Sequence, residues 1–210
     1  MRLLILSILA AAVLTFACAD PAANKTKATV GNAAPESGAA KPANAETLPI
    51  TAENSKVEFV AAKVTRSHNG SFKRFSGTID LTNNKPEDSR VSIDIEANSV
   101  ETDEPDLTKH LQTPDFFDVA KFPQASFVST EIKPGGTNGA THTVTGNLTM
   151  HGVTKSVTFP ATINVTPDLA SVDSSFSINR KDFGIVYAGA PDNLIRDNVV
   201  LKLTIRANKA

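Results

Sequence analysis

The sequence lacks most of the residues that build cross-links and catalytic centres. Cys18 is its only cysteine, so no disulfide can form within the chain, and a zinc site made of several thiolates is excluded. The four histidines show no metal-ligand spacing, and there is no Gly-x-Ser-x-Gly turn or phosphate-binding glycine loop. These absences predict no metal site and no catalytic residue, and they favour a protein that is not an enzyme.

An excess of charge of one sign is also missing. The 21 Lys and Arg residues almost cancel the 22 Asp and Glu residues, which argues against a nucleic-acid-binding surface. Tryptophan is absent and tyrosine occurs once, yet there are 11 phenylalanines. All but Phe16 lie within residues 59–183. The apolar aromatic side chains are therefore concentrated where a folded core is expected.

The first 18 residues have the pattern of a signal peptide. Arg2 is followed by an apolar run from Leu3 to Ala17, which as a helix is about 22 Å long and too short for a bilayer core of about 30 Å. Two kinds of processing fit this pattern, and an uncleaved membrane anchor is a third interpretation. Ala17-Cys18-Ala19 fits cleavage before Asp20, whereas the segment up to Cys18 resembles an imperfect lipobox, with Cys18 as the lipidated first residue.

Residues 19–48 are rich in alanine and proline and show no apolar periodicity. Such a segment buries too little surface to offset its ordering entropy, so we expect a disordered tether. A tether directly after Cys18 favours the lipoprotein interpretation, in which the chain is held at a membrane. The remaining residues, 49–210, are expected to form one domain.

Apolar and polar residues alternate with a period of two in eight segments of this domain. The pattern is strong at 57–61, 91–97, 157–165 and 199–207, and weaker at 72–82, 125–133, 142–150 and 170–179. Turn signals at 68–70, 83–86, 133–136 and 166–168 separate strands, and Glu104–Leu111 fits one short helix with Pro105 in its first turn. Pro160 inside a strong strand predicts an edge, a bulge or a bend. The sequence predicts an all-β fold, either an eight-stranded antiparallel barrel or a two-sheet sandwich.

Three long segments resemble the YceI-like family. They are HLQTPDFFDVAKFPQASF at 110–127, VTGNLTMHGVTKSV at 144–157 and INRKDFGI at 178–185, and shorter matches occur at 55–59 and 75–77. Their order and spacing agree over about residues 50–208. The resemblance implies a lipocalin-like barrel that holds a polyisoprenoid lipid, such as a quinone, in an apolar cavity. It also implies a bacterial envelope or periplasmic protein that is often a homodimer.

Candidate lining residues lie on apolar strand faces or within these motifs. They are Phe59, Phe75, Phe116, Phe117, Phe127, Leu148, Phe159, Phe176, Ile178 and Phe183. Each could equally be ordinary core, which is the more frequent place for a buried phenylalanine. Four polar residues of the motifs are expected to form either a mouth for a lipid head group or a structural network that fixes the short helix: His110, Asp115, Arg180 and Asp182.

We therefore predict a binding module that carries or stores an isoprenoid lipid at the cell envelope, attached through Cys18. A structural or adhesive envelope protein with a filled barrel is the alternative, and an enzyme acting on an envelope lipid or polymer is a weaker one. No cofactor other than the bound lipid is expected.

Overall fold

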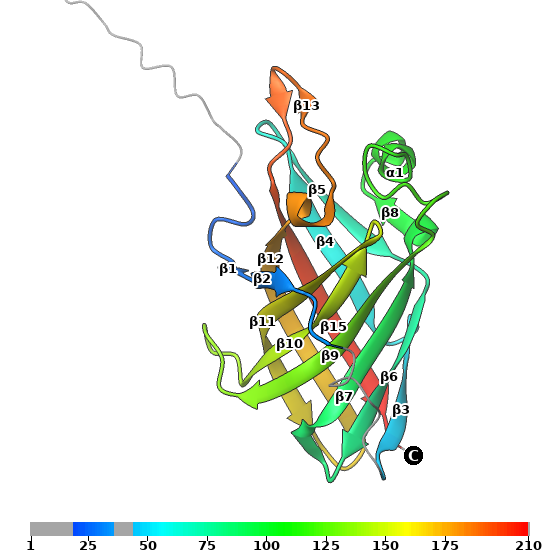
Figure 1. Cartoon of the computed structure of the whole chain (residues 1–210), viewed down its shortest axis with the longest axis vertical. Coiled ribbons are helices and arrows are strands. Elements are labelled where there is room, and N and C mark those ends of the chain that lie inside the picture. The colour runs from blue at the N-terminus through cyan, green and yellow to red at the C-terminus, as the bar shows by residue number, and fades with distance from the viewer. Residues whose placement is uncertain (1–18, 36–43, 210) are drawn as a thin grey trace, which may run out of the picture.

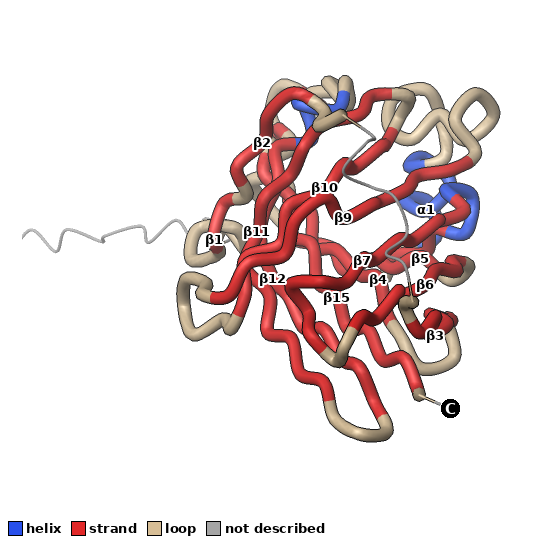
Figure 2. The backbone as a smooth tube through the Cα atoms, turned by 60° about the horizontal axis from the view of Figure 1, so that its bottom comes forward, coloured by secondary structure: helices blue, strands red, loops and turns tan. Residues whose placement is uncertain are grey.

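A computed structural model describes residues 19–35 and 44–209. Its main feature is one strongly curled β-sheet whose strands follow one another around a common axis (Figures 1 and 2). The long strands are β6 (Phe75–Thr82), β7 (Lys85–Glu96), β9 (Gln124–Pro134), β10 (His142–Met150), β11 (Val153–Val165), β12 (Leu169–Asn179), β15 (Asn198–Asn208) and β4 (Lys56–Ala62). These eight correspond to the eight predicted segments, so the all-β, barrel-like prediction is confirmed.

The sheet has more strands than predicted. Its order is β3-β6-β7-β9-β10-β11-β12-β15-β4-β5-β8, in which β3 (Glu46–Thr51), β5 (Ser67–Phe72) and β8 (Val100–Thr102) are additional. No ladder among the described strands joins β3 to β8, so the sheet curls without closing through hydrogen bonds. The turn predicted at 68–70 is wrong, because these residues lie inside β5.

Among the described residues, one short helix and two 3-10 turns interrupt the strands. Helix α1 spans Pro105–Leu111, as predicted, with Pro105 in its first turn. The turn η2 (Ala97–Ser99) precedes β8, and η3 (Arg180–Phe183) follows β12. A two-stranded hairpin, β13 (Gly189–Ala190) and β14 (Asn193–Leu194), projects beyond the sheet at the top of Figure 1.

The predicted disorder of residues 19–48 is wrong for the described residues of that range. Residues 20–35 are here called the N-terminal strap, and their central part, residues 26–32, lies between β11 and β12. Its strand β1 (Thr26–Lys27) pairs in parallel with β12, and β2 (Thr29–Asn32) pairs antiparallel with β11. The predicted signal peptide with Cys18 lies outside the described residues. No helix among the described residues has the length and hydrophobicity needed to cross a bilayer.

The strap has room because β11 and β12 pair with each other only over part of their length. Thr162–Val165 pairs with Ala170–Asp173, and beyond Thr162 the two strands separate. Pro160 lies where the outer edge of β11 changes partner from β2 to β12, a position where its missing N–H costs no ladder bond. Ala28 is 5% exposed and fills the inner side of the gap. The small side chain of alanine fits this narrow gap. An alanine-rich composition is therefore compatible here with an ordered segment and does not require disorder.

Three apolar clusters occupy the inside of the curled sheet. The first contains Leu48, Ile50, Ile79 and Ile205, and the second surrounds Phe159, Phe176 and Phe183. The third packs Phe59, Val100 and Ile185 against Leu111 of α1 and Phe116. The helix and the segment after it thus close one end of the barrel.

Candidate ligand-binding cavity

A cavity of about 100 Å³ lies where the three clusters meet. Pairs of facing residues on neighbouring strands build much of its wall. Val57 pairs with Leu203, Phe176 with Leu201, Phe127 with Leu148, and Ala125 with Ile95. Because paired residues share one face of the sheet, each pair directs two side chains into the same space.

The wall is almost wholly apolar. Among its residues only Gln124 and His151 carry polar side-chain groups, and Gln124 is also the one that is exposed to solvent. The rings of Phe159 and Phe176 are stacked with centroids 4.2 Å apart, and Phe127 lies 5.7 Å from Phe159. A cavity of this chemistry suits a hydrocarbon ligand, because polar wall groups would lose water when the ligand enters.

Gly146 makes space for one of these rings. A Cβ atom at this position would lie 2.4 Å from Cζ of Phe127 and 2.5 Å from the carbonyl oxygen of Val128. The β9–β10 register shifts between Thr145 and Gly146. The family-like sequence around Gly146 therefore has a steric role in shaping the wall.

The part of the wall made by Phe122, Gln124 and His151 includes the exposed Gln124 and is here called the mouth. Phe122 packs edge-on against His151 with ring centroids 4.9 Å apart, and a Cβ at Gly152 would lie 2.4 Å from the Phe122 ring. The Nδ1 group of His151 donates to the carbonyl oxygen of Phe183 at 3.2 Å. This bond fixes the β10–β11 turn against η3.

The structure divides the ten predicted lining residues into two equal groups. Phe117, Phe127, Leu148, Phe159 and Phe176 line the cavity. The other five are buried core outside its wall: Phe75 in the first cluster, Ile178 and Phe183 in the second, and Phe59 and Phe116 in the third. Ligand contact remains a prediction for the first group.

Several wall residues were missed although the sequence carried a signal for them. Val57, Ile93, Ile95, Leu201 and Leu203 lie on the apolar faces of the strongest alternating segments. Selecting only aromatic residues overlooked them. Phe122, Met150 and His151 lie in turns or at strand ends, and only the fold brings them to the cavity.

The four predicted polar residues do not come together at the mouth, and none of them lines the cavity. Nε2 of His110, in the last turn of α1, and Oδ2 of Asp115, just after the helix, are 2.8 Å apart, and both side chains are exposed. Asp182 lies in η3 and is partly exposed. The structure thus favours the structural alternative over a polar mouth.

Arg180 is a buried structural residue, 4% exposed. It donates to the carbonyl oxygens of Ile185 at 2.8 Å and Arg196 at 3.2 Å, and pairs with Asp197 at 3.3 Å. Burial lowers the pKa of Arg180, and the Asp197 carboxylate opposes this shift. The side chain fixes η3 to the segment that enters β15.

A second polar contact, between a buried histidine and an exposed carboxylate, lies away from the cavity. Nδ1 of His68, which is 8% exposed, is 2.8 Å from Oδ1 of Asp103. Burial raises the pKa of Asp103, but hydrogen bonds from the Asn69 N–H and His68 bring the pKa below its ordinary value of 3.8.

The described residues contain no group of His, Cys, Asp and Glu side chains that could hold a metal ion.

Comparison with solved structures shows the same fold in three bacterial proteins. BcnA of Burkholderia cenocepacia has a TM-score of 0.66 and 26% identity, covering 75% of this chain and 99% of BcnA. The YCEI protein of Campylobacter jejuni has a TM-score of 0.59 and 25% identity, covering 67% of this chain and 84% of that chain. A domain of Saccharophagus degradans described as polyisoprenoid binding has a TM-score of 0.61 and 16% identity, over 80% of this chain and all of that chain.

Curated bacterial relatives carry the name UPF0312 protein. The protein of Pseudomonas putida strain F1 is 42% identical over 127 residues, which cover 58% of this chain and 65% of that protein. The protein of Pseudomonas fluorescens strain SBW25 is 37% identical over 139 residues, 63% of this chain and 71% of that protein. The YceI-like domain model matches residues 49–207. The chain therefore belongs to the YceI-like domain family.

Proposed function

We propose that the protein binds an isoprenoid-type lipid, such as the tail of a quinone, in the apolar cavity and carries or stores it at the cell envelope. The observation that carries this proposal is the cavity wall, which is built from paired apolar side chains with polar groups only at the mouth. The polyisoprenoid-binding description of the Saccharophagus degradans neighbour supports the same ligand class.

Such a wall is sufficient for binding without any charged contact. Burial of hydrocarbon contributes about 0.8 kcal/mol per CH₂ group, so one prenyl unit contributes several kcal/mol before the ordering of the chain is subtracted. The cavity of about 100 Å³ is smaller than the engineered cavity of about 150 Å³ that holds benzene. A tail of several prenyl units therefore requires wall side chains to move apart.

The direct test is identification of the bound lipid. Protein purified from cells that express the full chain is extracted with solvent, and the extract is examined by mass spectrometry. We expect a prenyl lipid at about one molecule per protein. Protein that is always empty, and that binds no prenyl alcohol of any chain length in a titration, would contradict the proposal and favour a structural protein with a filled barrel.

The same material tests the proposed absence of catalysis and the proposed dimer. Extracted lipid that is recovered unchanged after prolonged incubation supports a binding protein, whereas hydrolysis or oxidation of it supports the enzyme alternative. A molar mass of about twice that of one processed chain by light scattering supports a homodimer.

We further propose that Cys18 carries a lipid anchor. Replacing Cys18 with serine is expected to release the protein from the membrane fraction and to abolish fatty-acid labelling. A wild-type protein that is never labelled would instead favour cleavage before Asp20 and a soluble envelope protein.

A further inference from the structure

Four large apolar side chains are exposed together at the hairpin end of the molecule. Among the described residues, the exposed large hydrophobic side chains are those of Val64, Val186, Tyr187 and Leu194, with exposed fractions of 39%, 64%, 37% and 47%. We call these four residues the hairpin patch. Exposed apolar residues scattered singly need no explanation, but these four lie close together at one end of the molecule, on the β4–β5 turn and on the segment that contains the hairpin.

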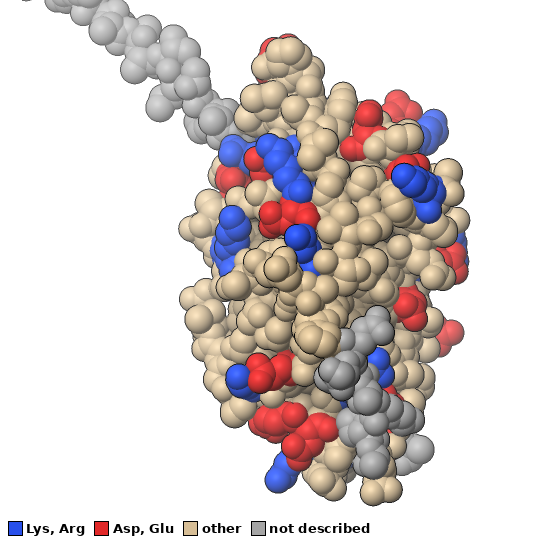
Figure 3. Space-filling model, viewed as in Figure 1, with Lys and Arg blue, Asp and Glu red and all other residues tan. Residues whose placement is uncertain are grey.

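Hydrogen bonds place the members of the hairpin patch side by side. The N–H of Val64 donates to the carbonyl oxygen of Leu194 at 3.0 Å, and the N–H of Ile195 donates to that of Ala188 at 2.9 Å. The segment that carries Val186 and Tyr187 is thus paired to the strand that carries Leu194. In the face seen in Figure 3, the projecting hairpin shows mostly uncharged atoms.

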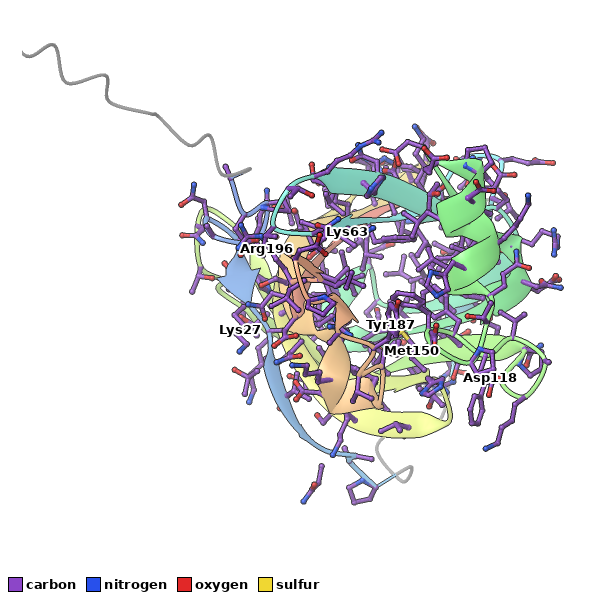
Figure 4. All side chains as sticks on the ribbon, turned by 90° about the horizontal axis from the view of Figure 1, so that it is seen from above. Lys27, Lys63, Asp118, Met150, Tyr187 and Arg196 are labelled. Atoms are coloured by element: carbon purple, nitrogen blue, oxygen red, sulfur yellow. The ribbon has the colours of Figure 1, made fainter. Side chains whose placement is uncertain are left out.

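Tyr187 of the hairpin patch is held by packing from below. The ring of Tyr187 lies 5.3 Å from His110 and 5.5 Å from Phe116, and these two rings pack against each other at 5.0 Å. From above, Tyr187 lies over the middle of the molecule, near Met150 in projection (Figure 4). The patch is therefore presented by a supported segment.

The N-terminal strap begins at this same end. Asp20 forms an ion pair with Arg196 at 3.4 Å, and Arg196 follows Leu194 by two residues. Figure 4 shows Arg196 and Lys63 near each other, on the side away from Asp118. Cys18 precedes Asp20 by two residues, which span at most about 7 Å of extended chain. A lipid on Cys18 would therefore enter a bilayer beside the hairpin patch.

We propose that the hairpin patch is a membrane-contacting surface, which rests in the headgroup region of a lipid bilayer next to the attached N-terminus. Tyrosine is suited to this region, because its ring is apolar and its hydroxyl group is polar. Asp192 at the hairpin turn is exposed and limits the depth of insertion to the headgroups. This inference rests on the proposed envelope location and not on the proposed ligand.

The size of the hairpin patch favours a bilayer over a second copy of the chain. A stable protein interface usually buries about 800 Å² on each partner and some 20–30 residues. A single acyl chain binds membranes only marginally, so a second weak contact with the bilayer decides whether attachment persists. Four apolar side chains beside an anchor supply such a contact.

Membrane contact at this end would also place the mouth of the cavity near the bilayer. His151 of the mouth donates to Phe183, three residues before Val186 of the hairpin patch. A lipid that leaves the bilayer would then travel only a short way to the cavity.

The absence of tryptophan allows a direct test by fluorescence. Full chains with Val186→Trp or Pro167→Trp are expressed, and the processed proteins are purified and added to vesicles of phosphatidylethanolamine and phosphatidylglycerol with brominated acyl chains. Pro167 is exposed in the β11–β12 turn at the opposite end of the barrel. We expect the bromines to lower emission of the Val186→Trp protein by about half and to leave the Pro167→Trp protein unchanged.

Two further comparisons complete the test. Adding Val64→Ser and Leu194→Ser to the Val186→Trp chain is expected to raise the lipid concentration needed for half-maximal quenching about tenfold. The circular dichroism spectrum should stay unchanged. Equal quenching at both ends, no quenching at either, or no effect of the serines would overturn the proposal. So would a blue shift that grows with protein concentration without vesicles, because it would mean self-association. Empty protein in the extraction experiment would leave this result unaffected.

Discussion

Replacing Ala125 with leucine adds three carbon atoms to the wall of the cavity. Ala125 lies on β9 opposite Ile95, and both side chains line the space of about 100 Å³. An unfilled apolar cavity costs about 24 cal/mol per Å³, so complete filling would stabilise the lipid-free protein by about 2.4 kcal/mol at most. Leucine fills only part of the space, and we expect a gain of about 1–2 kcal/mol. This corresponds to a rise in Tm of about 2–8 °C for a domain of this size.

The same substitution is expected to abolish uptake of a prenyl lipid, because the leucine side chain occupies the space that the first prenyl unit needs. Thermal unfolding of lipid-free protein and a titration with a prenyl alcohol measure the two effects. Ala52→Leu at an exposed turn position serves as the matched control and should change neither. A more stable Ala125→Leu protein that still binds the lipid as tightly as wild type would refute the assignment of this cavity as the binding site.

Three further predictions concern the structure around the cavity. Arg180→Ala leaves buried carbonyl groups unpaired and should lower the free energy of unfolding by about 3 kcal/mol in denaturant titrations, whereas a loss below 1 kcal/mol would contradict its structural role. Asn147 exchanges hydrogen bonds of 2.8 and 2.9 Å with the backbone of Ala34, so Asn147→Ala should raise amide exchange in residues 26–34 about tenfold, and unchanged protection would show that these bonds do not hold the strap. Because the pKa of Asp103 is lowered on folding, its contribution to stability is present above pH 4 and lost as the pH falls through the folded value. Asp103→Asn should therefore make the free energy of unfolding fall less steeply below pH 4, while Asp168→Asn in an exposed turn should not. Parallel curves of unfolding free energy against pH for Asp103→Asn and wild type would count against the lowered pKa of Asp103.

The long strands and the helix were predictable because their signals are local. Each of the eight alternating segments has one face against the core and one towards solvent, which a period of two records directly. Pro105 marks the start of α1 in the same way.

Strand β5 was missed because tertiary packing determined its sequence. His68-Asn69-Gly70 has the composition of a turn, but a Cβ at Gly70 would lie 2.1 Å from Cζ of Phe59 on the paired strand. The glycine is required under the aromatic ring and not for a turn. His68 is polar yet 8% exposed, because Asp103 is its partner. Neither requirement can be read without knowing which strand lies alongside.

Only half of the predicted lining residues line the cavity, for a related reason. The inward face of each strand was evident, but the position along the strand at which packing stops and the cavity begins depends on how all the strands are staggered. Phe176 lines the cavity, whereas Ile178 on the same face of β12 is core. The strap was missed because alanine-rich sequence gives the same signal when it is unstructured and when it fits a narrow gap.

The position of the strap has a consequence for the order of folding. Thr26 pairs with Phe176, and Val30 pairs with Val157, so the earliest described residues to leave the ribosome bind strands that are made more than a hundred residues later. The loop that closes when the strap docks is long, so its closure is slow and comes after β11 and β12 have formed. Until then the separated edges of these two strands expose backbone N–H and C=O groups that another chain could pair with. The strap therefore protects the finished protein from aggregation at a site that is vulnerable during its synthesis.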